Sequence, residues 1–332
     1  MCKKLHSNYQ KYIGEKLASV ELSAKNVALL TIFAALSFII CKFIPGIPIV
    51  GIPDASIKFD AAIAPLYGMI IGPYLGFLAA LIGGLIAAGS PFSVLTSFCT
   101  AISAMVAGFL TLDKILKNSK IQGWPISAVI LGALIAGWYA TWVGQKAIFY
   151  PVLHFAGLFS VLITRGWVAN SFKEIEAIKE GWRLKPASIL SGVILFVVGY
   201  MFTKPYLNET LPLNYLSLPL YIIGAIFVLY GIFGAGRFSF ISSVFLASYC
   251  GIIADHMLGN LIFIGTIDIF IPLSVVEDYF LKPLGLPDVP SLFMYMVPVS
   301  AIERILMTVI ATIVGIGLIS GLYKAGLIFK KQ

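Results

Sequence analysis

The fold of this chain is decided by an apolar run from near Phe238 to near Ile264, which contains Ser248-Tyr-Cys-Gly-Ile-Ile-Ala-Asp255-His256-Met-Leu-Gly-Asn260. As one helix, this run is long enough to cross roughly 30 Å of hydrocarbon. Ionisable side chains inside a membrane span are costly unless they are paired or solvated, so they often mark a function. Asp255, His256 and Asn260 are therefore the first candidate site residues, and the next long apolar run adds Glu303 and Arg304.

The composition indicates a polytopic membrane protein built from helices. Of the 332 residues, 59% are apolar and 11% are charged, and the mean hydropathy is +0.97, whereas soluble domains contain about 25% charged residues. The formal net charge is +8, but the Lys and Arg residues lie between apolar runs, where they act as a topology signal. We therefore expect a lipid bilayer as the surroundings and no nucleic acid as a partner.

Several chemical functions find no support in the sequence. The four cysteines are scattered singly, and only one of the three histidines is close in sequence to the carboxylates, so no metal site and no cofactor are predicted. The sequence contains no ATP-binding P-loop. If ATP drives this protein, a partner subunit must bind it. The polar, basic segment 1–25 reads as cytoplasmic, and the first span as a signal anchor that is not removed.

Ten membrane spans are predicted, with both termini in the cytoplasm, because most of the 23 Lys and Arg residues then lie on that side. The stretch from Asp60 to Ala88 would be about 43 Å long as one helix, so we expect Gly72-Pro73 to split it into two spans. The predicted spans are 26–43, 60–71, 73–88, a fourth that ends near 112, two within 126–164, 187–202, 217–234, 238–264 and 296–322.

Two surface features accompany these spans. Residues 167–185 form an amphipathic pattern that is typical of a helix lying along the membrane surface. On the first span, small residues recur along one face, at Ala24, Ala28, Thr31 and Ala35. Such a stripe lets another helix approach closely, either from this chain or from a partner subunit.

Five motifs in this order resemble the substrate-binding S components of energy-coupling factor (ECF) transporters. They are Ala34-Ala35-Leu36, Ile57-Lys58-Phe-Asp60, Tyr67-Gly-Met-Ile-Ile-Gly72-Pro73-Tyr-Leu-Gly76, Asp255-His256-Met-Leu-Gly259-Asn260 and Pro298-Val-Ser-Ala-Ile-Glu303-Arg304. S components of this type have six helices, so the resemblance implies core helices in 26–121 and 237–332, with four helices inserted in 122–236. An even number of inserted spans leaves the later helices in their original orientation.

The resemblance also implies partners and a mode of action. A small solute would be captured at the outer face, and the chain would associate with a transmembrane T component and two ATPase subunits. The stripe on the first span would contact the T component. The protein would thus be a binding subunit in the cell membrane and not an enzyme.

The candidate substrate-binding residues are Asp255, His256, Asn260, Glu303, Arg304, Lys58 and Asp60. At 1.5 Å per helical residue, Asp255 lies about 25 Å from the cytoplasmic end of its span, and Glu303 lies about 10 Å from the outer end of its own. Both depths fall in the outer half of the membrane. We therefore expect a cavity open to the outside, roofed by the loops 54–60 and 278–291.

Each candidate also has a structural interpretation. Arg304 could pair with Asp255 or Glu303 as a buried ion pair, His256 could be a core residue, and Lys58 and Asp60 could be interfacial anchors. Ser90, Ser93 and Thr96 could line the cavity or cap a helix.

The solute itself is left open. Carboxylates and donors at this depth suit a zwitterionic or carboxylate-bearing solute, of a vitamin-like or amino-acid-like kind. A stand-alone secondary transporter and a membrane-embedded enzyme are the rival functions, although no inverted repeat is apparent.

Overall fold

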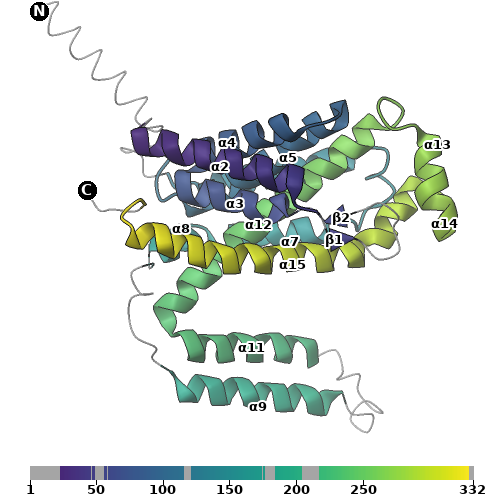
Figure 1. The fold of residues 1–332 in the computed structure, drawn as a ribbon. Coiled ribbons are helices and arrows are strands. Elements are labelled where there is room, and N and C mark those ends of the chain that lie inside the picture. Colours follow the sequence, from purple (N-terminus) through teal and green to yellow (C-terminus); the bar gives the residue numbers. More distant parts are fainter. Residues whose placement is uncertain are drawn as a thin grey trace, which may run out of the picture. The chain divides into compact units, whose positions relative to one another are not determined.

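A computed structural model of the chain describes residues 23–45, 47–48, 56–57, 59–115, 121–173, 175, 184–203 and 217–328 (Figure 1). Within this part, apolar helices occupy the positions of all ten predicted spans, which confirms an all-α polytopic membrane protein. Four helices, α2, α5, α12 and α15, are long and apolar enough to cross a membrane by themselves, and the six others are shorter. The ten are α2 (Ala24–Phe43), α3 (Asp60–Ile71), α4 (Pro73–Ala87), α5 (Pro91–Thr111), α6 (Trp124–Ala140), α7 (Val152–Thr164), α9 (Pro186–Phe202), α11 (Ser217–Phe233), α12 (Ala235–Thr266) and α15 (Val289–Lys324).

The chain divides into two compact units. The first unit comprises Met1–Asn170 and Ser243–Gln332, and the second comprises Ser171–Ser242. These bounds differ from the predicted core and insertion, because α6 and α7 belong to the first unit. The division into a six-helix core and a four-helix insertion stays a prediction, as does the orientation of the termini.

The break between α3 and α4 lies where the sequence predicts it. Gly72 has φ +87°, a conformation that favours glycine, and Pro73 opens α4, where its missing N–H costs nothing. On α3, Gly68 packs so closely on α5 that an added Cβ would lie 1.7 Å from the Ala104 carbonyl oxygen. Small residues thus bring α3, α4 and α5 into direct backbone contact.

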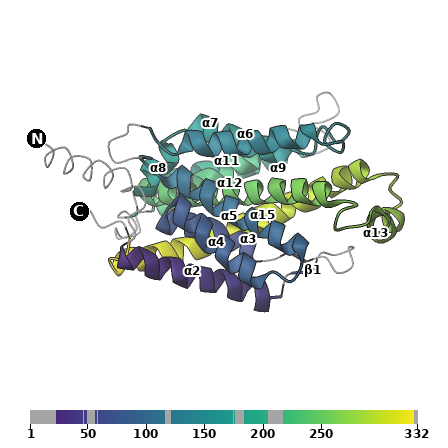
Figure 2. The same cartoon turned by 90° about the horizontal axis from the view of Figure 1, so that it is seen from above.

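Helix α12 is the centre of the first unit. It lies between the α6–α7 pair and the group formed by α2, α4 and α5 (Figure 2). Gly157 of α7 packs on Ile253, and Gly251 packs on Ser103 of α5. A buried cluster joins α3, α12 and α15 through Ala62, Ile252, Met307 and Ala311. These contacts hold the polar residues of α12 on a rigid support.

Short elements cover one end of the first unit. The segment between α12 and α15 forms α13 (Leu273–Val276), a single π-helical turn η3 (Glu277–Leu281) and α14 (Lys282–Leu284). A second buried cluster packs this segment and the loop after α6 against α12 and α15; it comprises Trp138, Val143, Ala147, Tyr150, Met257, Ile264, Val276, Leu281, Val289, Leu292 and Phe293. Before α3, the two-residue strands β1 (Ile47–Pro48) and β2 (Ser56–Ile57) pair antiparallel.

The predicted surface helix is described only in part. Helix α8 (Trp167–Phe172) begins where expected, and Val168, Phe172 and Ile175 of the predicted apolar face are buried. Residues 176–183 lie outside the described part. Whether 167–185 rests on the membrane surface stays a prediction.

In the second unit, α9 and α11 lie side by side (Figure 1). Gly192 and Gly224 face each other, since a Cβ on Gly192 would lie 2.5 Å from the Gly224 carbonyl oxygen. At one end of the pair, Lys185 Nζ donates a hydrogen bond of 2.8 Å to the Tyr230 hydroxyl. Helices α9 and α11 are thus a pair that packs through small residues.

Candidate functional site

Arg304 of the apolar helix α15 lies between two carboxylates. Its Nη2 is 2.8 Å from Glu303 Oε1, and its Nη1 is 3.8 Å from Asp255 Oδ2 of α12. The three side chains are only 11–13% exposed. The ion pair that the sequence left open is therefore present. It does not exclude contact with a solute, because all three residues also line a cavity.

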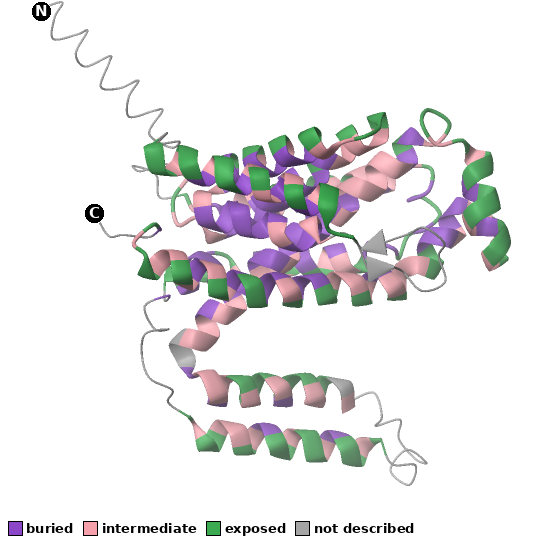
Figure 3. Ribbon diagram, in the orientation of Figure 1, coloured by how far each residue is buried: buried purple, intermediate pink, exposed green. Residues whose placement is uncertain are grey.

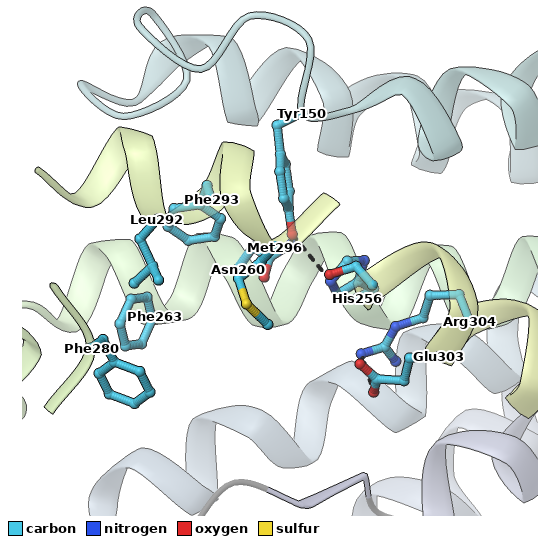
Figure 4. A pocket seen from close by; sticks show the side chains of 11 residues that line it. Tyr150, His256, Asn260, Phe263, Phe280, Leu292, Phe293, Met296, Glu303 and Arg304 are labelled. Atoms are coloured by element: carbon cyan, nitrogen blue, oxygen red, sulfur yellow. Dashed lines mark hydrogen bonds and ion pairs between the residues drawn. The ribbon is translucent and has the colours of Figure 1, made fainter. Parts of the chain in front are cut away.

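Tyr150, in the loop between α6 and α7, connects the polar residues of α12. Asn260 Nδ2 donates a hydrogen bond of 2.8 Å to the Tyr150 hydroxyl, which lies 3.2 Å from His256 Nε2 (Figure 4). The hydroxyl accepts from Asn260, and it donates its own proton to His256 Nε2 in the histidine tautomer that leaves this nitrogen unprotonated. The tyrosine ring stacks on Trp138 with centroids 4.5 Å apart. One aromatic residue thus orients two predicted site residues.

Two cavities border this polar cluster. The first, which we call the aromatic cavity, has a volume of about 270 Å³ and is lined by Tyr150, His256, Asn260, Phe263, Phe280, Leu292, Phe293, Met296, Ser300, Glu303 and Arg304 (Figure 4). The second, the polar cavity, has a volume of about 350 Å³ and is lined by Asp60, Ala61, Phe92, Thr96, Cys99, Thr100, Asp255, His256, Gly259, Asn260, Glu303 and Arg304. His256, Asn260, Glu303 and Arg304 belong to both linings. A solute bound at this shared wall can reach either cavity.

Six of the seven predicted substrate-binding residues meet at these cavities. Asp60, at the start of α3, lines the polar cavity, and its Oδ2 accepts a 3.2 Å hydrogen bond from the Cys41 thiol. Lys58 lies outside the described residues. The role of the seven residues in binding stays a prediction, but the grouping of six of them follows from the fold.

The three hydroxyl residues at the start of α5, Ser90, Ser93 and Thr96, have two different roles. Ser90 and Ser93 form a capping box, in which each side chain bonds to the backbone of the other residue. Thr96, one turn further, lines the polar cavity. Capping therefore explains the two serines, and the threonine remains available to a solute.

A second histidine, which is distant in sequence, lies behind His256. The rings of His154 and His256 stack with centroids 5.3 Å apart and an interplanar angle of 22°. His154 is 1% exposed, and neither of its ring nitrogens has a hydrogen-bond partner within the described part of the chain. Among the same residues, no group of three or more His, Cys, Asp or Glu side chains could hold a metal ion.

The sequence did not single out Tyr150 or the aromatic wall. Tyr150 lies in an irregular turn, where hydrophobic periodicity carries no information, and the phenylalanines of the cavity resemble ordinary lipid-facing residues of apolar helices. The one available signal was Gly144-Gln-Lys146, which marks a turn between two spans. Only the packing of this turn against α12 makes Tyr150 part of the site.

The stripe of small residues on α2 is exposed. Ala24, Ala28, Thr31 and Ala35 all face away from the rest of the chain, as the exposed residues along this helix in Figure 3 illustrate. The opposite face is buried through Leu29, Phe33, Ser37 and Ile40. Within the described residues, the stripe therefore does not serve internal packing, and its role in docking a partner stays a prediction.

The fold and the cavities define a multi-pass membrane protein in which the aromatic cavity and the polar cavity share a wall of polar and charged residues. Residues 21–164 match the family model described as ECF-type riboflavin transporter, S component. This match confirms the resemblance to ECF S components over α2 to α5, which includes Asp60, and it extends through α6 and α7, which the sequence predicts to be part of the insertion. No curated protein and no solved structure gives a significant match to the chain.

Proposed function

We propose that this chain is the substrate-binding subunit of an ECF-type importer in the cell membrane. The match of residues 21–164 to an S-component family carries this proposal. In it, a small vitamin-like or amino-acid-like solute enters from outside, and partner subunits hydrolyse ATP to complete the uptake. The family description names riboflavin, which makes riboflavin the first solute to test.

The site geometry supports a binding role over an enzymatic one. Small-molecule sites are concave, mostly apolar and equipped with few polar groups that fix the orientation of the ligand. The aromatic cavity has this character, and the polar residues at its inner wall, His256, Asn260, Glu303 and Arg304, are held by an ion pair and by the Tyr150 hydroxyl. Such preorganised groups bind a solute without further ordering.

Assembly and transport provide the main test. The tagged chain is purified from its native membranes and then reconstituted in liposomes with the proteins that elute with it. We expect a T component and ATPase subunits to elute with the chain, and solute uptake to require ATP. A chain that elutes alone and drives ion-coupled uptake alone would instead be a secondary transporter.

The stripe on α2 allows a matched test of the docking surface. Ala28→Trp places a large side chain on this exposed surface, which would prevent close approach of a partner helix. Ala133→Trp makes the same change at an exposed alanine of α6. We expect the first variant to lose the T component during purification and the second to retain it. Equal retention by both variants would rule out the stripe as the docking surface.

A further inference from the structure

We infer that the solute carries a positive charge and that the polar cavity receives its cationic group. This inference rests on the proposed function, since it assumes that the two cavities bind the transported solute. It departs from riboflavin, which is neutral at pH 7.

The charges around the polar cavity are unbalanced. Its described lining contains three carboxylates, Asp60, Asp255 and Glu303, and one guanidinium, Arg304, so the formal sum is −2. Lys58 lies outside the described residues, and its addition to the site would leave −1. A cavity with this lining attracts cations and repels anions.

Arg304 does not neutralise all three carboxylates. Its short contact, 2.8 Å, is to Glu303, whereas its distance to Asp255 is 3.8 Å, beyond the usual 2.7–3.2 Å of an N–H···O hydrogen bond. Asp60 accepts a hydrogen bond from the Cys41 thiol, which is a weak and uncharged donor. Two carboxylates therefore face the cavity without a full counter-charge.

Asp255 is the residue that points most directly to a ligand. Its side chain is 11% exposed and lines the polar cavity, and it accepts no hydrogen bond from any described residue. A largely buried carboxylate without a hydrogen-bond donor is costly, and Asp255 has only the 3.8 Å contact with Arg304 in exchange for the water that it has lost. An ammonium or other cationic group of the solute would supply both the missing donor and the missing charge.

The aromatic cavity fits the remainder of such a solute. The rings of Tyr150, Phe263, Phe280 and Phe293 line it and offer flat apolar faces, which bind planar ring systems and also attract cations. His256 and Asn260 stand between the two cavities. We therefore expect a planar ring in the aromatic cavity and the positive charge toward Asp255.

The test uses three probes that share one ring and differ in charge: nicotinate, nicotinamide and 1-methylnicotinamide. Their dissociation constants are measured by titration calorimetry on the purified full-length chain. We expect the cation to bind at least about tenfold more tightly than the neutral amide, and the anion to bind most weakly. Asp255→Asn should reduce this preference to about threefold or less.

Two further variants keep the test decisive. Glu277→Gln removes an exposed carboxylate of η3 that lines neither cavity, and it should leave the preference unchanged. If Asp255→Asn does not fold, Asp60→Asn should lower the preference in the same direction.

Four outcomes would overturn the inference. They are equal binding of neutral and cationic probes, tighter binding of the anion, no saturable binding of the cation up to about 10 mM, and an Asp255-dependent stabilisation by Na⁺ alone. The last outcome would mean a free cation site. Tight riboflavin binding with no charge preference would overturn this inference and leave the proposed function intact, whereas loss of the ATPase partners would contradict only the proposed function.

Discussion

At the scale of single residues, Arg304 decides how the charges of the site are compensated. Its two contacts differ in length, 2.8 Å to Glu303 and 3.8 Å to Asp255. Because the coupling between charges falls with distance and with imperfect hydrogen bonding, the contact with Glu303 should dominate. The contact with Asp255 is then the weaker of the two.

Double mutants measure how much more strongly Arg304 interacts with Glu303 than with Asp255. Arg304→Met removes the guanidinium and leaves two buried carboxylates, so we expect a loss of about 3 kcal/mol in unfolding free energy. Adding Glu303→Gln should recover most of this loss, and adding Asp255→Asn should recover less. Thermal unfolding in detergent provides the readout. A larger recovery with Asp255→Asn would contradict the assigned pairing.

Tyr150 provides the second prediction at this scale. Tyr150→Phe keeps the stacking on Trp138 but removes the hydroxyl that serves Asn260 and His256, so we expect a loss of about 1–2 kcal/mol. Tyr139→Phe is the matched control, because its hydroxyl bonds to the Ile148 carbonyl in an exposed position. The control should change stability by less than about 0.5 kcal/mol. Equal effects of both variants in thermal unfolding would show that the buried hydroxyl has no special role.

At the scale of elements, the close packing of α3 on α5 depends on the glycine at position 68. Gly68→Ala would force α3 and α5 apart, because the added Cβ would meet the Ala104 carbonyl at 1.7 Å. We expect a loss of about 1–3 kcal/mol, visible as a lower melting temperature in detergent. Gly132→Ala on α6 is the control, since no atom lies within 4 Å of its added Cβ. A melting temperature equally reduced in the control would contradict the packing argument.

The stability of the N-terminal end of α15 should depend on pH. The Ser291 hydroxyl and backbone N–H both donate to Asp288 Oδ1, at 2.6 and 2.9 Å, and they hold the pKa of the Asp288 carboxyl below its usual value. A lowered pKa in the folded state means that this stabilisation is present above about pH 4 and is lost as the pH falls through the folded pKa.

Asp288→Ala should therefore cost about 1 kcal/mol at pH 7 and less near pH 3, where the native cap is itself being protonated. Melting temperatures of both proteins across this range provide the measurement. A cost that stays constant down to pH 3 would show that the charge of Asp288 does not contribute to the cap.

At the scale of the whole molecule, every residue that lines the aromatic cavity or the polar cavity belongs to the first compact unit. Deletion of residues 184–234 removes two predicted spans, α9 and α11, and an even number of spans leaves the orientation of α12 in the membrane unchanged. We expect the dissociation constant of 1-methylnicotinamide to change by less than about threefold. If binding is lost from a monodisperse deletion protein, the second unit contributes to the site.

The membrane architecture could be predicted because each span carries its own signal. A run of apolar residues such as 217–234 is a helix in lipid whatever its neighbours are, since every backbone group must be bonded internally. The break at Gly72-Pro73 is equally local. For the same reason Asp255, Glu303 and Arg304 stood out, because charge within an apolar run is conspicuous.

The contacts between spans could not be predicted in this way. The sequence left Arg304 with two candidate carboxylate partners, because helical spacing places residues on one face of a helix but does not fix the rotation of one helix against another. Lateral packing between membrane helices depends on shape and small residues, and apolar side chains in lipid give little directional preference.

The sequence by itself therefore determined that this is a helical multi-pass membrane protein with buried charges on two of its long helices. Only the tertiary structure decided that Tyr150 from the turn after α6 bonds to Asn260 and lies beside His256, that His154 stacks behind His256, and that Arg304 lies closer to Glu303 than to Asp255. The physical reason is that hydropathy is a property of each segment, whereas hydrogen bonding, stacking and charge compensation depend on which segments meet.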